Sequence, residues 1–122
     1  MSDFEFEDLD AWQEAKALTV KVYQHTEKGG WTLDFLLRDE TRRAAMQIGK
    51  EIARGYGLGT NVDVRRQLRK ARSAGFTLQA LLCVGRDLGY GSTEDYKVFC
   101  RAIRTLVRMI DDLARDATRR LM

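Results

Sequence analysis

Hydrophobic residues recur at three- and four-residue steps along most of the chain, and glycine-rich stretches divide this pattern into four segments. The first segment runs from about Asp8 to Glu27. Its recurring positions are Leu9, Trp12, Ala15, Leu18, Val22 and Tyr23. This spacing places them on one face of a helix. Asp8 or Asp10 can cap the first turn, and Lys28-Gly29-Gly30 predicts the end of the helix.

The second segment runs from about Thr32, a suitable N-cap residue, to Arg54, and the glycines of residues 55–59 close it. Its inward stripe is predicted to be Leu33, Leu36, Leu37, Thr41, Ala44, Ala45, Ile48 and Ile52. Ala45, Gly49 and Ala53 form a neighbouring ridge of small residues. A glycine inside a helix costs about 1 kcal/mol relative to alanine, so Gly49 predicts a close helix–helix contact.

The third segment begins after Thr60 or Asn61, both good N-cap residues, and continues to Leu88. One face carries Ala71, Gly75, Leu78, Leu82 and Gly85. The two glycines on this face again predict close helix contacts.

The fourth segment follows Gly89-Tyr90-Gly91, with Ser92 or Thr93 as N-cap and acidic residues in the first turn. Its apolar side carries Phe99, Ile103, Leu106, Ile110, Ala117 and Leu121. Four long amphipathic helices with short connections predict an all-α fold. The expected architecture is an antiparallel up-down-up-down four-helix bundle, formed as a single domain by residues 1–122.

Charge is distributed unevenly along the chain. Residues 1–14 carry six acidic and no basic side chains, whereas residues 15–122 carry 21 basic and 12 acidic ones, a formal charge of +9. We expect residues 1–7 to be an acidic leader, which could be flexible. A hypothesis is that the leader, Asp3–Asp10, folds over a basic surface of its own or a neighbouring subunit.

The composition, 44% hydrophobic and 32% charged residues, is typical of a soluble globular protein. The sequence contains nothing near the run of about 18 apolar residues that a membrane span requires. Its first residues are acidic where a signal peptide is basic and then apolar, so we expect no membrane association and a cytoplasmic location.

Residues that could support catalysis or bind a metal are few. The single histidine, His25, lies near the end of a helix and is interpreted as a surface residue that suits the helix dipole. Cys83 and Cys100 lack a Cys-x-x-Cys pair or partner histidines and are interpreted as reduced, buried thiols. We therefore expect a non-enzymatic protein with no metal site and no cofactor.

Basic residues gather on the third and fourth segments. At about 100° per residue, those of the fourth segment form one stripe opposite its apolar side. The candidate nucleic-acid-binding residues are Arg65, Arg66, Arg69, Arg72, Lys97, Arg101, Arg104, Arg108, Arg115 and Arg119. Two interpretations stay open: a solvated surface with local ion pairs to Asp111, Asp112 and Asp116, or a surface that follows the phosphates of RNA or DNA. Tyr96 and Phe99 are expected in the core, so binding would be mainly electrostatic and weakly sequence-specific.

A second apolar strip on the third segment predicts self-association. Thr77, Leu81, Val84 and Leu88 recur at three- and four-residue steps outside the predicted core face. A strip of this length is unfavourable on a monomer. We expect a homo-oligomer with these residues in its interface.

Several short motifs, in this order along the chain, resemble one known family. They are Trp12-x-x-Ala15, Val22-Tyr23-x-x-Thr26, Arg42-Arg43-Ala44-Ala45, Ile48, Ile52-Ala53-x-Gly55, Ala71 and Leu88-Gly89-Tyr90. The combination resembles the four-helix-bundle proteins of the 23S ribosomal RNA intervening-sequence family, from about Leu9 to Leu121. The chain departs from the family pattern at Gln47, Gly49, Glu51, Arg54, Thr77 and Gln79. Thr77 and Gln79 stand where the family is usually acidic, and these losses together with the gain of Arg54 make the chain more basic.

The resemblance implies an antiparallel bundle that assembles as a ring, commonly a homopentamer, with no established enzymatic activity. The family is related to the accessory variability proteins of diversity-generating retroelements, which look like basic pentameric bundles that bind nucleic acid and a reverse transcriptase. We therefore predict a nucleic-acid-binding or scaffold module that binds RNA or DNA. The alternative is an adaptor ring that docks a reverse transcriptase or another partner protein.

Overall fold

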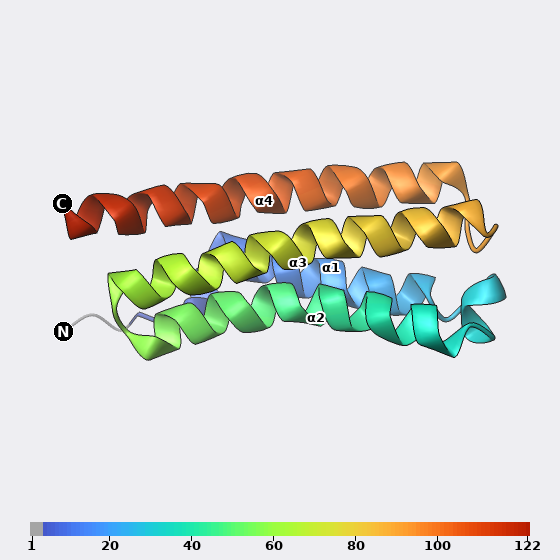
Figure 1. The fold of residues 1–122 in the computed structure, drawn as a ribbon, viewed down its shortest axis with the longest axis horizontal. Helices are drawn as coiled ribbons and strands as arrows, with labels where there is room; N and C mark the ends of the chain where they lie inside the picture. Colours follow the sequence, from blue (N-terminus) through green and yellow to red (C-terminus); the bar gives the residue numbers. More distant parts are fainter. Residues whose placement is uncertain (1–3) are drawn as a thin grey trace.

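The structure is a computed structural model, and it describes residues 4–122. The elements in chain order are η1 (Phe6–Asp8), α1 (Asp10–His25), η2 (Gly29–Thr32), α2 (Phe35–Leu58), α3 (Asn61–Asp87) and α4 (Thr93–Leu121). Figure 1 shows the four α-helices lying side by side along the long axis of the molecule. No strand occurs among residues 4–122, so the predicted all-α fold is confirmed.

Contacts between neighbouring helices establish their antiparallel order. Between α1 and α2, the Thr19 hydroxyl donates to the Ala45 carbonyl at 3.1 Å, while the earlier residue Arg42 donates to Thr26, just beyond the end of α1, at 2.8 Å. The chain of α2 therefore runs back along α1. Short turns connect α2 to α3 and α3 to α4 and reverse the chain direction again (Figure 1). The predicted up-down-up-down bundle is confirmed.

The starts of α3 and α4 lie where the sequence predicts them. The Thr60 hydroxyl accepts a hydrogen bond from the Asp63 amide at 3.1 Å, and the Ser92 hydroxyl accepts one from the Asp95 amide at 3.0 Å. Asp95 also accepts from the Ser92 amide, which completes a capping box. These side-chain oxygens satisfy backbone donors that a helix start leaves unpaired.

The predicted limits of α1 and α2 are partly wrong. Thr32 lies in η2 and is not the N-cap of α2; the Asp34 carboxylate caps this helix by accepting from the Leu37 amide at 3.1 Å. The helix then passes Arg54 and ends at Leu58, because only Gly59 takes the left-handed conformation, with φ of 88°. In α1, neither predicted aspartate is the N-cap: Leu9 occupies that position, and the helix ends at His25 rather than Glu27.

The core is built from the predicted stripes of all four helices, with four exceptions. Leu18, Ile48, Leu78 and Ile103 are almost completely buried, and each comes from a different helix. Tyr23 is only partly buried and packs against Arg42 instead of the core. Leu33 and Leu36, predicted to point inward, are 84% and 76% exposed: Leu33 precedes α2, and Leu36 lies about 100° around the helix from Leu37, which packs against the core. Leu121, also predicted in the core, is exposed in the last turn of α4.

Within the α-helices, glycines allow close packing at two positions, Gly55 and Gly85, and the predicted Gly49 and Gly75 are not among them. A Cβ on Gly49 would meet Ala15 and Trp12 at 3.7 Å, which is an ordinary contact, so the prediction that this contact requires glycine is wrong. A Cβ on Gly55 would lie 3.3 Å from the Cα of Val64. A Cβ on Gly85 would overlap the buried ring of Trp31.

Four rings close the end of the bundle where α1 ends and α4 begins, and we call them the aromatic end cluster. It consists of His25, Trp31, Tyr90 and Phe99. The His25 ring lies 5.1 Å from Phe99 and 5.9 Å from Trp31, and Trp31 lies 5.6 Å from Tyr90. The Tyr90 hydroxyl donates to the Asp34 carboxylate at 3.1 Å and so ties the α3–α4 turn to the start of α2.

The interpretation of His25 as a surface residue is wrong, since its ring is half-buried in this cluster. Burial lowers the pKa of His25 below its ordinary value, and the nearby Asp95 carboxylate opposes this effect. Lys28 lowers the pKa further. The histidine thus packs as an aromatic ring at the helix end.

Both cysteines are free thiols, and their environments differ. Cys100 is buried as predicted, whereas Cys83 is only partly buried. The Arg86 guanidinium lies 3.2 Å from the Cys83 sulfur. The prediction of buried thiols is therefore confirmed for Cys100 and wrong for Cys83.

Aromatic contacts hold the acidic leader against the bundle. The Phe4 ring lies 5.5 Å from Tyr56, and the Phe6 ring lies 5.2 Å from Trp12. Glu5, Glu7 and Asp8 are exposed, and none of them forms an ion pair within residues 4–122. Residues 1–3, which include Asp3 of the predicted leader, lie outside the described residues.

None of the helices in the described part of the chain combines the length and the apolar character that crossing a membrane requires.

Candidate nucleic-acid interface

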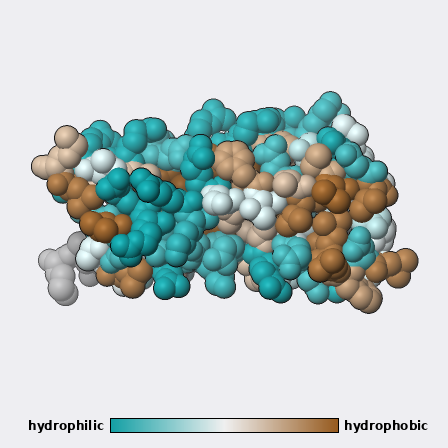
Figure 2. Space-filling view, in the orientation of Figure 1, coloured by the Kyte–Doolittle hydropathy of each residue, from teal (hydrophilic) through white to brown (hydrophobic). Residues whose placement is uncertain are grey.

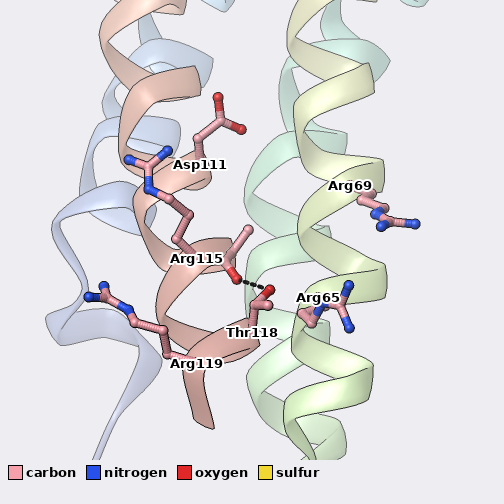
Figure 3. A pocket seen from close by; sticks show the side chains of 7 residues that line it. Arg65, Arg69, Asp111, Arg115, Thr118 and Arg119 are labelled. Carbon is pink, nitrogen blue, oxygen red and sulfur yellow. Dashed lines mark hydrogen bonds between the residues drawn. The ribbon is translucent and has the colours of Figure 1, made fainter. Parts of the chain in front are cut away.

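A groove of about 510 Å³ runs between the first half of α3 and the second half of α4, and we call it the arginine groove. Its lining residues are Arg65, Arg69, Asp111, Ala114, Arg115, Thr118 and Arg119. Figure 3 shows Thr118 between the two helices, with the Arg65 and Arg69 side chains directed outward from α3 and those of Arg115 and Arg119 directed outward from α4 on the opposite side, so that the two pairs flank the groove. Two helices thus bring four cations to one surface.

Helix geometry explains why these four arginines line the same groove. Residues four apart lie on the same side of a helix, so Arg65 and Arg69 form one row and Arg115 and Arg119 form another. The two helices run antiparallel, which places the beginning of α3 beside the end of α4 (Figure 1). On the groove floor, the Thr118 hydroxyl donates to the Ala114 carbonyl at 2.9 Å (Figure 3).

The remaining predicted basic residues are exposed but lie outside this groove. Arg101, Arg104 and Arg108 continue the stripe along α4, and Lys97 lies at its far end. Lys97 and Arg119 are 22 positions apart, which corresponds to about 33 Å along a helix. The structure therefore keeps the predicted stripe and concentrates one part of it into a groove.

Local ion pairs account for four of the ten predicted cations. Arg66 pairs with Asp63 at 3.2 Å, Arg72 with Asp111 at 3.0 Å, and Lys97 with Glu94 at 3.6 Å. Arg115 pairs with Asp112. Exposed pairs of this kind contribute about 0–1 kcal/mol, so they hold the side chains weakly.

The other six predicted cations have no carboxylate partner within residues 4–122. They are Arg65, Arg69, Arg101, Arg104, Arg108 and Arg119. Three of the six line the arginine groove, where the one acidic residue, Asp111, is already paired with Arg72. The groove thus has an excess of positive charge.

The predicted apolar strip lies on the side of α3 next to α2, and its residues differ in how far they are exposed. Thr77 lines a separate groove of about 340 Å³ opposite Glu40 of α2. Leu81 is partly buried against the core, whereas Val84 and Leu88 are 48% and 54% exposed.

A residue from α2 extends this strip. Leu36 lies one turn before Glu40 and therefore on the same side of its helix. We call Leu36, Leu81, Val84 and Leu88 the apolar patch. Figure 2 shows hydrophobic colouring concentrated at the end of the molecule where α3 ends and α2 begins.

A second apolar surface, not predicted from the sequence, lies between α1 and α2. This groove of about 400 Å³ is lined mainly by apolar side chains, among them Trp12, Val20 and Met46, with Lys16 and Lys50 beside them. Val20 lies outside the core face of α1 and is exposed. The small residues Ala15 of α1 and Gly49 of α2 line the same groove. Only the pairing of α1 with α2 places these residues side by side.

Sequence reasoning also missed two polar residues of the arginine groove. Asp111 was expected only as a local ion-pair partner of the basic stripe, and Thr118 carried no signal. Neither can be assigned to a groove until the register between α3 and α4 is known. Among residues 4–122, no three His, Cys, Asp or Glu side chains are grouped as ligands of a metal ion would be.

Comparison with known proteins agrees with the resemblance noted in the sequence. The family model described as 23S rRNA-intervening sequence protein matches residues 7–112, which include η1, α1, α2, α3 and most of α4. Comparison with curated protein sequences finds no match. Since the family model spans far more than half of this four-helix bundle, the chain belongs to the 23S rRNA-intervening sequence protein family.

Proposed function

We propose that this protein is a non-enzymatic, homo-oligomeric module that binds RNA or DNA through the arginine groove and the basic stripe of α4. The observation that carries the proposal is one groove lined by four arginines from two helices, three of them without a carboxylate partner in the described chain. Guanidinium groups bind phosphate oxygens with two parallel hydrogen bonds and remain charged at all physiological pH values. A cytoplasmic location is part of the same proposal.

The arrangement suits phosphates better than base edges. The cations lie on exposed helix surfaces along about 33 Å of α4, so they can contact several phosphates in succession. Contacts of this kind give affinity and orientation without reading sequence directly. We therefore expect weak sequence preference and a strong dependence on salt.

The test is a fluorescence-polarisation titration with single- and double-stranded RNA and DNA across a salt series. The Arg69→Gln/Arg119→Gln variant removes two exposed cations of the groove. If both contact phosphates, the slope of log affinity against log salt becomes less steep by about 1.4 for a single strand and about 1.8 for a duplex.

Lys21→Gln/Arg54→Gln is the matched control, because it removes the same charge from exposed positions of α1 and α2. The proposal requires the groove variant to lose more affinity than this control. Equal losses, or no binding by the wild-type protein at about 50 mM salt, would contradict it.

Self-association is the second part of the proposal, with another copy of the chain covering the apolar patch. The patch presents the exposed side chains of Leu36, Val84 and Leu88, while the α1–α2 groove is hollowed and lined mainly by apolar side chains. Shape and apolar character thus support contact between the patch of one copy and the groove of the next. Such a contact joins two different surfaces and generates rings when it closes, and a ring of five is what the family resemblance implies.

Light scattering on two variants tests this contact. Val84→Asp places a charge in the patch, and Val20→Asp places one in the α1–α2 groove. We expect the wild type to exceed the 14.0 kDa chain mass and each variant to approach it. An equimolar mixture should form pairs, since each variant retains the surface that the other lacks.

Val98→Asp, at an equally exposed valine of α4, is the control and should assemble like the wild type. A wild-type mass of 14.0 kDa at all concentrations would refute self-association. A mixture that stays monomeric would refute the patch-to-groove contact.

The adaptor alternative, a ring that docks a reverse transcriptase or another protein, stays a prediction. Gene neighbourhood discriminates between the two functions. A neighbouring reverse-transcriptase gene with variable repeats favours the adaptor, and a location inside a ribosomal RNA gene favours the nucleic-acid-binding module.

A further inference from the structure

An exposed aromatic ring lies beside the arginine groove, on the side of α3 that faces α4. Phe76 is 45% exposed, and the guanidinium of Arg72 lies over its ring, 5.0 Å from the centroid. Arg72 in turn donates to the Asp111 carboxylate of α4 at 3.0 Å. A single exposed phenylalanine is common on protein surfaces, so its position rather than its exposure is informative.

We propose that the groove binds single-stranded RNA or DNA, with one base stacked on Phe76 next to the Arg72 guanidinium. This inference rests on the proposed nucleic-acid-binding function and specifies the class of ligand. Phe76 supplies what the cations lack, a flat apolar surface for a base.

The ring and the groove form one continuous surface. Asp111 lines the groove and also pairs with Arg72, so the Arg72–Phe76 pair begins where the groove ends. Arg69 and Phe76 are seven residues apart on α3, which corresponds to about 10 Å along the helix. Stacked nucleotides are spaced by about 3.4 Å per strand, so a phosphate at Arg69 and a base at Phe76 belong to the same short stretch.

The Arg72–Asp111 ion pair gives the site a defined geometry. The carboxylate holds the guanidinium at the boundary between α3 and α4, and the guanidinium covers part of the Phe76 ring. Arginine and aromatic planes are both surfaces on which unpaired bases stack. A base that reaches this position therefore meets two suitable planes.

Stacking on a side chain selects single strands. In a duplex, each base is covered by its neighbours, and an aromatic side chain on a helix surface reaches only phosphates and groove edges. Proteins that bind single strands without strong sequence preference combine a cationic groove with aromatic side chains in this way. The arginines alone would accept either form of nucleic acid.

The experiment compares Phe76→Ala with the wild type, using labelled single strands and duplexes of about 12 nucleotides, as both RNA and DNA. Phe35→Ala is the matched control, because Phe35 is also an exposed phenylalanine with an arginine, Arg38, 4.9 Å from its ring centroid. It lies at the start of α2, outside the groove.

We expect Phe76→Ala to weaken single-strand binding by about fivefold or more, while duplex binding and the salt slope stay unchanged. Phe76→Tyr should retain the wild-type affinity, because tyrosine preserves the stacking surface. The two single strands distinguish RNA from DNA as the preferred ligand.

Three outcomes would overturn this inference: equal effects of Phe76→Ala and Phe35→Ala, equal losses for single strands and duplexes, or an unchanged affinity with a lower light-scattering mass. The last outcome would mean that a second copy of the chain covers Phe76. If Arg69→Gln/Arg119→Gln weakens binding and Phe76→Ala does not, the inference fails while the proposed function stands.

Discussion

The two ends of this bundle use the space between helices in opposite ways. At the end where α1 stops and α4 starts, four rings fill the interior, and Gly85 leaves the space that the Trp31 ring occupies. At the end where α3 starts and α4 stops, the surface between α3 and α4 is hollowed and lined by arginines. The comparison teaches that α3 and α4 can contribute to a packed aromatic interior at one end of the bundle and to an exposed cationic groove at the other.

The largest effect is expected at the packed end. Gly85→Ala would drive a methyl group into the Trp31 ring, which is only 1% exposed and has no space to move. We expect a loss of about 3 kcal/mol in the free energy of unfolding, measured by denaturant titration.

Gly75→Ala, on the same helix, is the control for this substitution. Its Cβ would meet Val107 at 3.5 Å, an ordinary contact, so this variant should be neutral or slightly more stable. Equal destabilisation by both variants would show that the ring contact is not what makes Gly85 sensitive.

The arginine groove should respond in binding and not in folding. Removing its three unpaired cations with Arg65→Gln/Arg69→Gln/Arg119→Gln is expected to weaken nucleic-acid binding roughly 30-fold at low salt. The melting temperature should change little, because none of the three forms an ion pair within residues 4–122. A large fall in melting temperature would mean that these side chains stabilise the fold. The two ends of the bundle would then not differ in their role.

The aromatic end cluster should make stability depend on pH. Burial lowers the pKa of His25 in the folded protein, so the unfolded chain binds the proton more readily. Stability should therefore be intact above about pH 6.5, the ordinary histidine pKa, and fall as the pH drops below it. Because His25 is the only histidine in the chain, His25→Gln should flatten unfolding curves measured between about pH 7 and pH 5.5. An unchanged pH dependence in this variant would show that His25 does not titrate with folding.

The smallest effect is expected between the two ends, at the contact of α1 with α2. Gly49→Ala fits the space beside Ala15 and Trp12 and removes the cost of a mid-helix glycine. We expect stabilisation by up to about 1 kcal/mol, seen as a rise of roughly 4 °C in melting temperature. Destabilisation would indicate that α1 and α2 approach more closely than the 3.7 Å contacts imply.

Sequence reasoning predicted the helices and the core well where the signals are local. Ser92 and Thr60 cap helices because their hydroxyls bond to amides three residues ahead, a geometry that the chain itself encodes. The same reasoning failed at Thr32, since Asp34 caps α2 instead and Leu33 is left before the helix, where it is exposed. Both residues are acceptable caps, and the packing of Trp31 and Tyr90 around η2 is not visible in a local pattern.

The chain by itself determined its four helices, its inner apolar faces and the basic side of α4, since each depends on residues a few positions apart. Tertiary structure decided which of the arginines share a groove, because that depends on the register between α3 and α4. It also decided that His25 packs as a ring and that Phe76 borders the arginines. These features join residues tens of positions apart, and only the packed helices bring them within contact distance.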